Sequence, residues 1–147
     1  MNTEFSYPKW ADLPDLELYL DQVLLYVNQV CSSAMPQIDK GLTASMVNNY
    51  VKHGYVDKPV KKKYQRQQLA RLIAITTLKT VFSIQEIAET LDILGKDSDS
   101  PQLYDDFVRY MNGETTEVAP VIASSCQTVK LYQETLAIIH QEVHHER

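Results

Sequence analysis

The chain has 147 residues, of which 44% are hydrophobic and 22% charged, with a net charge of −5. This size and composition predict one compact domain, or a small domain with an appendage, and exclude a long disordered tract. The absence of any run of about 18 apolar residues excludes a membrane-spanning helix. The N-terminus lacks the basic and apolar regions of a secretory signal, and Cys31 and Cys126 are far apart, so we expect reduced, buried thiols in a cytoplasmic protein.

The charges are distributed unevenly along the chain. Between Lys40 and Thr80 there are nine basic residues and one acidic residue, Asp57, which gives a net charge of +8. The rest of the chain has 5 basic and 18 acidic residues and a net charge of −13. A local positive field favours partners that carry phosphate groups. The alternative is a solvated basic surface without a ligand.

Apolar residues recur at spacings of three and four along most of the chain, which predicts a mainly helical fold. The first helix is expected to have about 18 residues, with Asp12 as its N-cap and an apolar stripe over residues 16–31. A shorter helix follows, with Thr43 as its N-cap and Gly54 in a left-handed position after it. We expect a loop or a small two-stranded wing over residues 55–64.

The second half of the chain predicts four more helices. The helix over residues 66–79 has apolar residues around most of its circumference, so it should be the buried central element. The next helix opens with a capping box formed by Ser83 and Glu86. The last two helices are predicted over residues 100–113 and from a start between residues 117 and 124 to about residue 144.

The short second helix is the candidate for reading DNA bases. Its outer face is expected to carry Ser45, Asn48, Asn49 and Lys52, which are spaced so that they share one side of a helix. Asn pairs bidentately with adenine, Ser donates or accepts, and Lys reaches guanine or a phosphate. Thr43 and the free backbone amides at the helix N-terminus can hold a phosphate. The alternative is an ordinary amphipathic surface helix.

A basic strip with an aromatic residue at its edge follows this helix. Long cationic side chains next to a recognition helix are suited to positioning contacts with the DNA backbone. The strip adds six candidates for DNA contact: Lys58, Lys61, Lys62, Lys63, Tyr64 and Arg66.

The order of helix, basic wing, buried helix and capped helix resembles the DNA-binding domain of MerR-like regulators over residues 41–91. In this resemblance residues 43–50 match the recognition helix, 54–56 the following turn, Tyr64 the wing tyrosine and 69–87 the next helix pair. The segments Leu13–Tyr19, Met46–Lys52 and Pro59–Tyr64 more closely resemble the bacterial family called domain of unknown function 1836, over residues 13–94.

The resemblance implies an all-α fold with a MerR-like helix-turn-helix domain and a small wing over residues 1–95. Residues 96–147 would then be a C-terminal helical pair that serves as a dimerisation element. The last helix supports this with Ile122, Val129, Leu136 and Val143 at heptad spacing. The alternative is that this helix packs only on its own domain.

Residue patterns for catalysis are missing from the chain. His140 and His144 have the spacing of a metal pair, but Gln141 stands where a metalloprotease has Glu, and we expect neither metal nor cofactor. No phosphate-binding or nucleophile-elbow motif occurs, so we expect no enzyme. The leading hypothesis is a homodimeric regulator that binds double-stranded DNA. The alternatives are a protein-interaction module without DNA binding, and a small-molecule or metal sensor built on the C-terminal helices.

Overall fold

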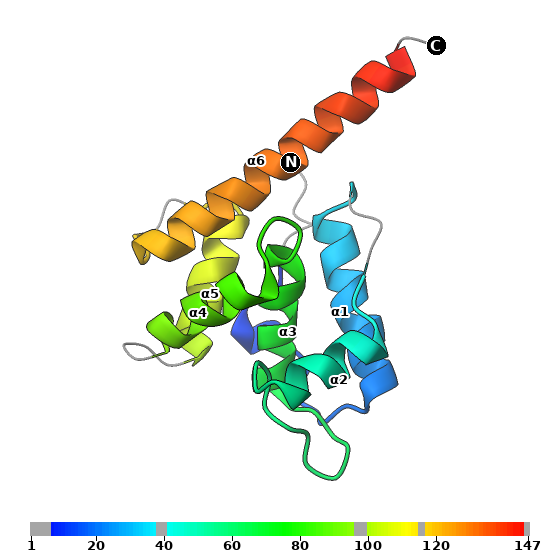
Figure 1. The fold of residues 1–147 in the computed structure, drawn as a ribbon, viewed down its shortest axis with the longest axis vertical. Coiled ribbons are helices and arrows are strands. Elements are labelled where there is room, and N and C mark those ends of the chain that lie inside the picture. The colour runs from blue at the N-terminus through cyan, green and yellow to red at the C-terminus, as the bar shows by residue number, and fades with distance from the viewer. Residues whose placement is uncertain (1–6, 38–40, 96–99, 115–116, 146–147) are drawn as a thin grey trace.

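The computed structural model describes residues 7–37, 41–95, 100–114 and 117–145. These residues form six α-helices and one short 3₁₀ turn, which confirms the mainly helical fold class (Figure 1). These ranges contain no β-strand, only two isolated β-bridges. The elements are η2 (Trp10–Asp12), α1 (Leu20–Ala34), α2 (Ala44–Lys52), α3 (Arg66–Leu78), α4 (Ile84–Leu94), α5 (Ser100–Met111) and α6 (Pro120–His145).

Helix α3 is the central element of the molecule, as its all-round apolar character predicts. Helices α1, α4, α5 and α6 all pack against it (Figure 1). Most of its side chains are buried. The removal of their apolar surface from water is the main stabilising contribution to the fold. The buried residues of α3 are Gln68, Leu69, Ala70, Leu72, Ile73, Ile75, Thr77 and Leu78.

Helix α4 begins at the predicted capping box. Ser83 Oγ accepts a hydrogen bond from the Glu86 N–H at 3.1 Å, and Glu86 Oε1 accepts one from the Ser83 N–H at 2.9 Å. Ile87 is buried, whereas Ile84 and Leu91 are half-buried and pack against the core. The helix therefore lies on α3 with part of its apolar face still accessible.

Helix α1 begins later than the sequence predicted. It starts at Leu20, so Asp12 is not its N-cap but part of the separate turn η2. Pro14 lacks an N–H and disfavours helical backbone in the residue before it. Leu18 is held in extended pairing with Tyr64, through N···O hydrogen bonds of 2.9 and 2.7 Å. A long-range contact therefore keeps this segment out of the helix.

The apolar stripe of the first helix is correspondingly shorter than predicted. Leu16, which was expected on the stripe, is 73% exposed because it lies before the helix begins. Within α1 the stripe is confirmed by the buried residues Val23, Val27 and Cys31.

The N-terminal segment connects the first elements to α5. The Tyr7 N–H donates to Asn112 Oδ1 at 2.9 Å, and the Trp10 N–H donates to Asp105 Oδ1 at 2.8 Å. Helices α5 and α6 pack against each other and against α3. The division of the chain into units before and after residue 95 stays a prediction.

Helix α6 lies within the predicted limits, and its two halves differ in environment. Ile122 and Val129, which were predicted as part of the dimerisation seam, are buried with Cys126 against the rest of the protein, so this part of the predicted seam belongs to the core. The second half extends beyond the other helices, as Figure 1 shows. The part of α6 from Leu131 onward, which we call its second half, carries five exposed large apolar side chains: Leu131, Tyr132, Ile138, Ile139 and Val143.

Both cysteines are free, buried thiols, as predicted. Burial raises the pKa of Cys31 and of Cys126 to about 12, so both are protonated at neutral pH. No helix in the described parts of the chain is long and apolar enough to cross a membrane.

Candidate nucleic-acid interface

Helix α2 has one face in the core and one in solvent, as the residue spacing predicts. Val47 and Tyr50 are buried, and burial raises the pKa of the Tyr50 hydroxyl. Thr43 is the N-cap, and its Oγ1 accepts a hydrogen bond from the Met46 N–H at 3.2 Å. The outer face presents four side chains that were predicted to read bases, all of them exposed: Ser45, Asn48, Asn49 and Lys52.

Asn28 on α1 fixes the segment that leads into α2. Its Nδ2 donates to the Leu42 carbonyl oxygen at 2.9 Å, and its Oδ1 accepts from the Leu42 N–H at 2.7 Å. Gly41 permits this close approach, since a Cβ at that position would lie 2.5 Å from Asn28 Oδ1. Because both backbone groups of Leu42 are satisfied by one side chain, the start of α2 is fixed relative to α1.

Two side chains of α3 hold the segment that follows α2. Arg71 donates from Nε to the Tyr55 carbonyl oxygen at 2.7 Å, and Gln68 donates from Nε2 to the Asp57 carbonyl oxygen at 2.8 Å. Gly54 has a φ of 78°, which confirms the left-handed position predicted for it. Helix α2 is thus anchored at both ends by side chains of the two long helices beneath it.

Residues 60–63 form a tight turn that we call the lysine turn. Val60 and Lys63 exchange two backbone hydrogen bonds, with N···O distances of 3.2 and 3.0 Å. The central residues Lys61 and Lys62 have φ values of 52° and 68°. Two successive positive φ values are typical of a type I′ turn, which prefers Asn and Gly. The predicted wing is therefore a single turn closed by one bridge, with lysines in a backbone conformation that costs about 1–2 kcal/mol per residue.

Tyr64 follows the lysine turn but belongs to the core. Its side chain is only 4% exposed, and its backbone pairs with Leu18 in the antiparallel bridge. The aromatic ring was predicted to contact DNA from the edge of the basic strip. Burial of its apolar surface instead makes it an anchor for the base of the turn.

Arg66 also has a structural environment that the sequence did not predict. Its Nη2 lies 3.0 Å from Asp15 Oδ1, and its guanidinium lies 5.8 Å from the centre of the Trp10 ring. These contacts tie the N-terminal segment to the start of α3. Arg66, which was expected to contact a phosphate, therefore also makes contacts within the fold, and its phosphate contact stays a prediction.

The remaining lysines stay accessible around the turn. Lys58, Lys61 and Lys62 are exposed, and Lys63 is half-buried with its Nζ 5.8 Å from the centre of the Tyr19 ring. Figure 1 shows α2 and the loop after it at the same end of the molecule. Helix α2 and the lysine turn thus lie at one end of the molecule, with Tyr64 buried at the base of the turn and Arg66 paired with Asp15.

Several residues that shape this surface were missed by the sequence analysis. His53 is exposed next to Lys52, with its ring stacked on Tyr55 at 5.8 Å and its Nδ1 2.9 Å from the Asn49 carbonyl oxygen. Its place directly after the outer face of α2 was the signal that could have identified it. The anchoring side chains Asn28, Gln68 and Arg71 had no local signal, because their partners are 11 to 16 residues away in the chain.

The candidate metal pair on α6 is incomplete in the described region. His140 Nδ1 is hydrogen-bonded to Gln37 Oε1, and the side chain of His144 lies outside the described residues. No group of three His, Cys, Asp or Glu side chains suited to a metal ion occurs in the part of the chain that is described.

Comparison with known proteins gives one family match. Residues 8–107 match the family described as Domain of unknown function (DUF1836), which includes α1 to α4 and most of α5. No curated protein and no solved structure matched the chain. Because the match spans well over half of the sequence and includes the whole surface described above, the chain belongs to the DUF1836 family.

Proposed function

We propose that this protein is a transcriptional regulator that binds duplex DNA through a MerR-like winged helix-turn-helix domain. The observation that carries the proposal is the exposed polar face of α2 beside the lysine turn, at one end of the molecule. The charge distribution supports it, since this region holds most of the basic residues of an otherwise acidic chain. A regulator of this type acts at the chromosome, so the proposal includes a cytoplasmic location.

In this proposal α2 enters the major groove. Its nine residues span about 13.5 Å at 1.5 Å per residue, and the major groove is about 12 Å wide. Asn48 and Asn49 point away from the core and supply planar amides for adenine, with Ser45 and Lys52 on either side. Thr43 marks the N-terminal end, where free backbone amides favour a phosphate.

The lysine turn and Lys58 would contact the DNA backbone. Lysine side chains reach phosphates without a fixed angle, so they contribute affinity that is independent of base sequence. Asn and Gly at positions 61 and 62 would suit the positive φ values better than lysine does. Lysine at these two positions therefore lowers the stability of the turn. It also carries the positive charge that phosphate binding needs and that Asn and Gly lack.

We further propose that two copies associate through the second half of α6. Leu131 and Ile138, and likewise Tyr132 and Ile139, are seven residues apart, and all four are exposed. Apolar residues at heptad spacing are typical of a helix that pairs with another helix. A second copy is the natural occupant, because a two-fold pair presents two α2 helices to successive turns of DNA.

The alternative function is a protein-interaction module, in which the same surface meets an acidic protein. The exposed acceptors and donors of α2 are compatible with either partner, and salt dependence distinguishes them. DNA releases condensed counterions on binding, so the logarithm of the affinity falls with the logarithm of the salt concentration by about 0.9 per phosphate contacted.

The test starts with genomic fragments retained by the purified protein. A retained fragment carrying a fluorescent label is titrated between about 50 and 200 mM salt, and we expect a slope of about −3 to −4 for the four lysines of each bound copy, or about −7 for a bound pair. Lys79→Gln is the matched control, since Lys79 is an exposed lysine at the far end of α3 and should leave the slope unchanged. Failure to retain any fragment, with no measurable affinity at the lowest salt, would favour the protein-interaction module.

A further inference from the structure

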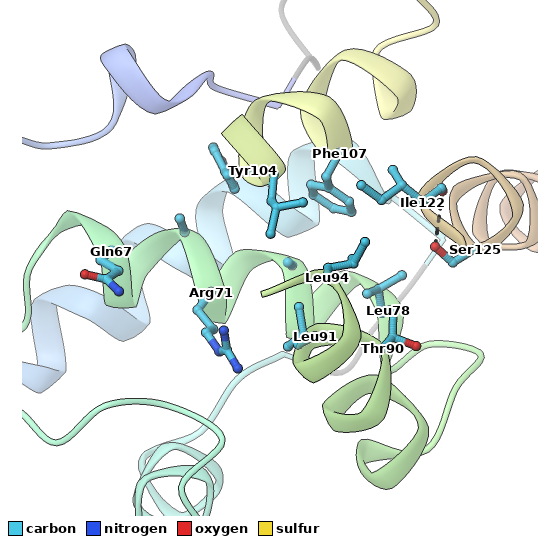
Figure 2. Close-up of a pocket in the computed structure, with 13 residues that line it drawn as sticks. Gln67, Arg71, Leu78, Thr90, Leu91, Leu94, Tyr104, Phe107, Ile122 and Ser125 are labelled. Atoms are coloured by element: carbon cyan, nitrogen blue, oxygen red, sulfur yellow. Dashed lines mark hydrogen bonds between the residues drawn. The ribbon is translucent and has the colours of Figure 1, made fainter. Parts of the chain in front are cut away.

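An apolar cavity lies between four helices on the side of α3 that faces α4, α5 and α6. It has a volume of about 80 Å³, against about 10–15 Å³ needed for one water molecule. Figure 2 shows Leu91 and Leu94 of α4 on one side of it, Tyr104 and Phe107 of α5 and Ile122 of α6 on the other. The cavity exists because α4 leaves part of its apolar face uncovered.

A second hollow continues the cavity towards the start of α6. It has a volume of about 140 Å³ and is lined by Phe82, Ile87 and Val121. Leu78, Thr90 and Ser125 line both spaces, so the second hollow adjoins the first across these residues. The two hollows therefore lie next to each other along the C-terminal half of α3. An apolar cavity of about 150 Å³ is enough to bind a molecule of the size of benzene.

The first cavity has a cationic end. Arg71 lies beside Leu91, at the opposite end of the lining from Ile122 and Ser125 (Figure 2). Burial lowers the pKa of its guanidinium, and the charges of Asp57 and Asp92 oppose this shift. The Nε hydrogen bond to Tyr55 is the contact that fixes the side chain. A partly desolvated cation next to an apolar cavity is stabilised by an anion that brings its own apolar body.

We propose that this space binds a carboxylic acid with an extended apolar chain, whose carboxylate pairs with Arg71. The apolar chain of the acid would run from Arg71 past Leu91 and Leu94 to Thr90, where the two hollows adjoin. Because Arg71 also holds the Tyr55 carbonyl oxygen behind α2, a bound carboxylate competes for the guanidinium that anchors the DNA-reading helix. This regulatory consequence rests on the function proposed above, whereas binding of the acid does not.

Binding is tested directly with dodecanoate on the full chain, by calorimetry, with dodecanol as the neutral analogue. We expect dodecanoate to bind at least about tenfold more tightly than dodecanol, a difference of about 1.4 kcal/mol. Arg71→Gln should remove this preference and leave dodecanol binding unchanged, which also shows that the variant is folded. The matched control is Arg109→Gln, because Arg109 pairs with Asp106 on α5 and does not line the cavity.

The position of the acid's apolar chain is tested by substitutions that fill the cavity with larger side chains. Ala74→Leu adds a side chain to the lining from α3, and Thr90→Phe blocks the junction of the two spaces from α4, where Thr90 is half-exposed. Each should weaken dodecanoate binding about tenfold or more. Equal affinity in wild type and both variants, or no binding of dodecanoate to the wild type at millimolar concentration, overturns the proposal.

The coupling between acid binding and DNA binding is tested separately, by measuring DNA affinity with and without dodecanoate. Saturating dodecanoate should change the affinity of the wild-type protein for a retained DNA fragment and leave that of Arg71→Gln unchanged. Equal DNA affinity with and without dodecanoate overturns the coupling. A protein that binds dodecanoate but no DNA contradicts the DNA-binding function and leaves the cavity assignment standing.

Discussion

At the scale of single residues, the lysine turn combines an unfavourable backbone with a concentrated charge. Replacing Lys61 by Asn and Lys62 by Gly supplies the residues that a type I′ turn prefers. We expect the double variant to gain about 1 kcal/mol or more in free energy of unfolding, measured with a chemical denaturant, and to lose DNA affinity. Lys58→Asn, outside the positive-φ pair, should lose affinity without gaining stability. Unchanged stability of the double variant would contradict the strain assigned to these lysines.

The DNA surface should also separate into two classes of residue. Changing Lys61, Lys62 and Lys63 together to Gln should weaken binding to all sequences and reduce the salt slope by about three contacts. Asn48→Ala or Asn49→Ala should cost about 1–3 kcal/mol at the preferred site and little on random DNA. Competition titrations with retained and random fragments measure both effects. Equal losses on both kinds of DNA from both sets of variants would rule out sequence recognition.

The contact between Gly41 and Asn28 gives a third prediction at this scale. Gly41→Ala places a Cβ 2.5 Å from Asn28 Oδ1, so the amide must leave the Leu42 backbone. We expect a loss of about 1–3 kcal/mol in free energy of unfolding, because buried backbone groups lose their partner. Asn28→Ala removes the same hydrogen bonds, and the double variant should cost clearly less than the sum of the two single variants. Strict additivity would show that the two residues act independently.

At the scale of elements, α3 is the helix against which α1, α4, α5 and α6 all pack. Leu72 is fully buried on it, and Leu72→Ala should cost about 2–5 kcal/mol through lost burial and an unfilled cavity. Leu25→Ala is the matched control on α1, where Leu25 is 72% exposed, and it should change stability by less than about 0.5 kcal/mol. Thermal and denaturant unfolding measure both variants. A change below 0.5 kcal/mol for Leu72→Ala would contradict a central role for this helix.

The elements also show where a helical pattern is misleading. The stripe from Leu16 onward has the right spacing, yet helix formation starts only at Leu20. The difference arises because the Leu18 backbone finds a partner in Tyr64, whereas Pro14 disfavours helical backbone only at Leu13 before it. Periodicity reports which residues would share a face if the segment were helical, and it contains no information about a competing strand partner.

At the scale of the whole molecule, the far half of α6 decides the oligomeric state. We expect the wild type to be a dimer by light scattering at tens of micromolar. Ile139→Asp places a charge among the exposed apolar residues and should give a monomer. Leu16→Asp alters an exposed apolar residue elsewhere, 73% exposed against 48% for Ile139, and should remain a dimer. A monomeric wild type would contradict the proposed pairing of two DNA-binding surfaces.

The helical elements that could be predicted from the sequence are those whose signals lie within a few residues. Thr43 and Gly54 delimited α2, Ser83 and Glu86 capped α4, and the all-round apolar character of α3 marked the centre. These features depend on hydrogen bonds and burial patterns within one or two helical turns, so they can be predicted from residue types at fixed spacing.

Long-range contacts, and not local sequence signals, determine which residues of the candidate interface face solvent and which support it. Tyr64 and Arg66 look like their exposed neighbours in the sequence, but they are held by Leu18 and Asp15, which lie far away in the chain. The same holds for Asn28 at Leu42 and Arg71 at Tyr55. Such contacts form between groups that only folding brings together, because no local preference specifies the distant partner of a polar side chain.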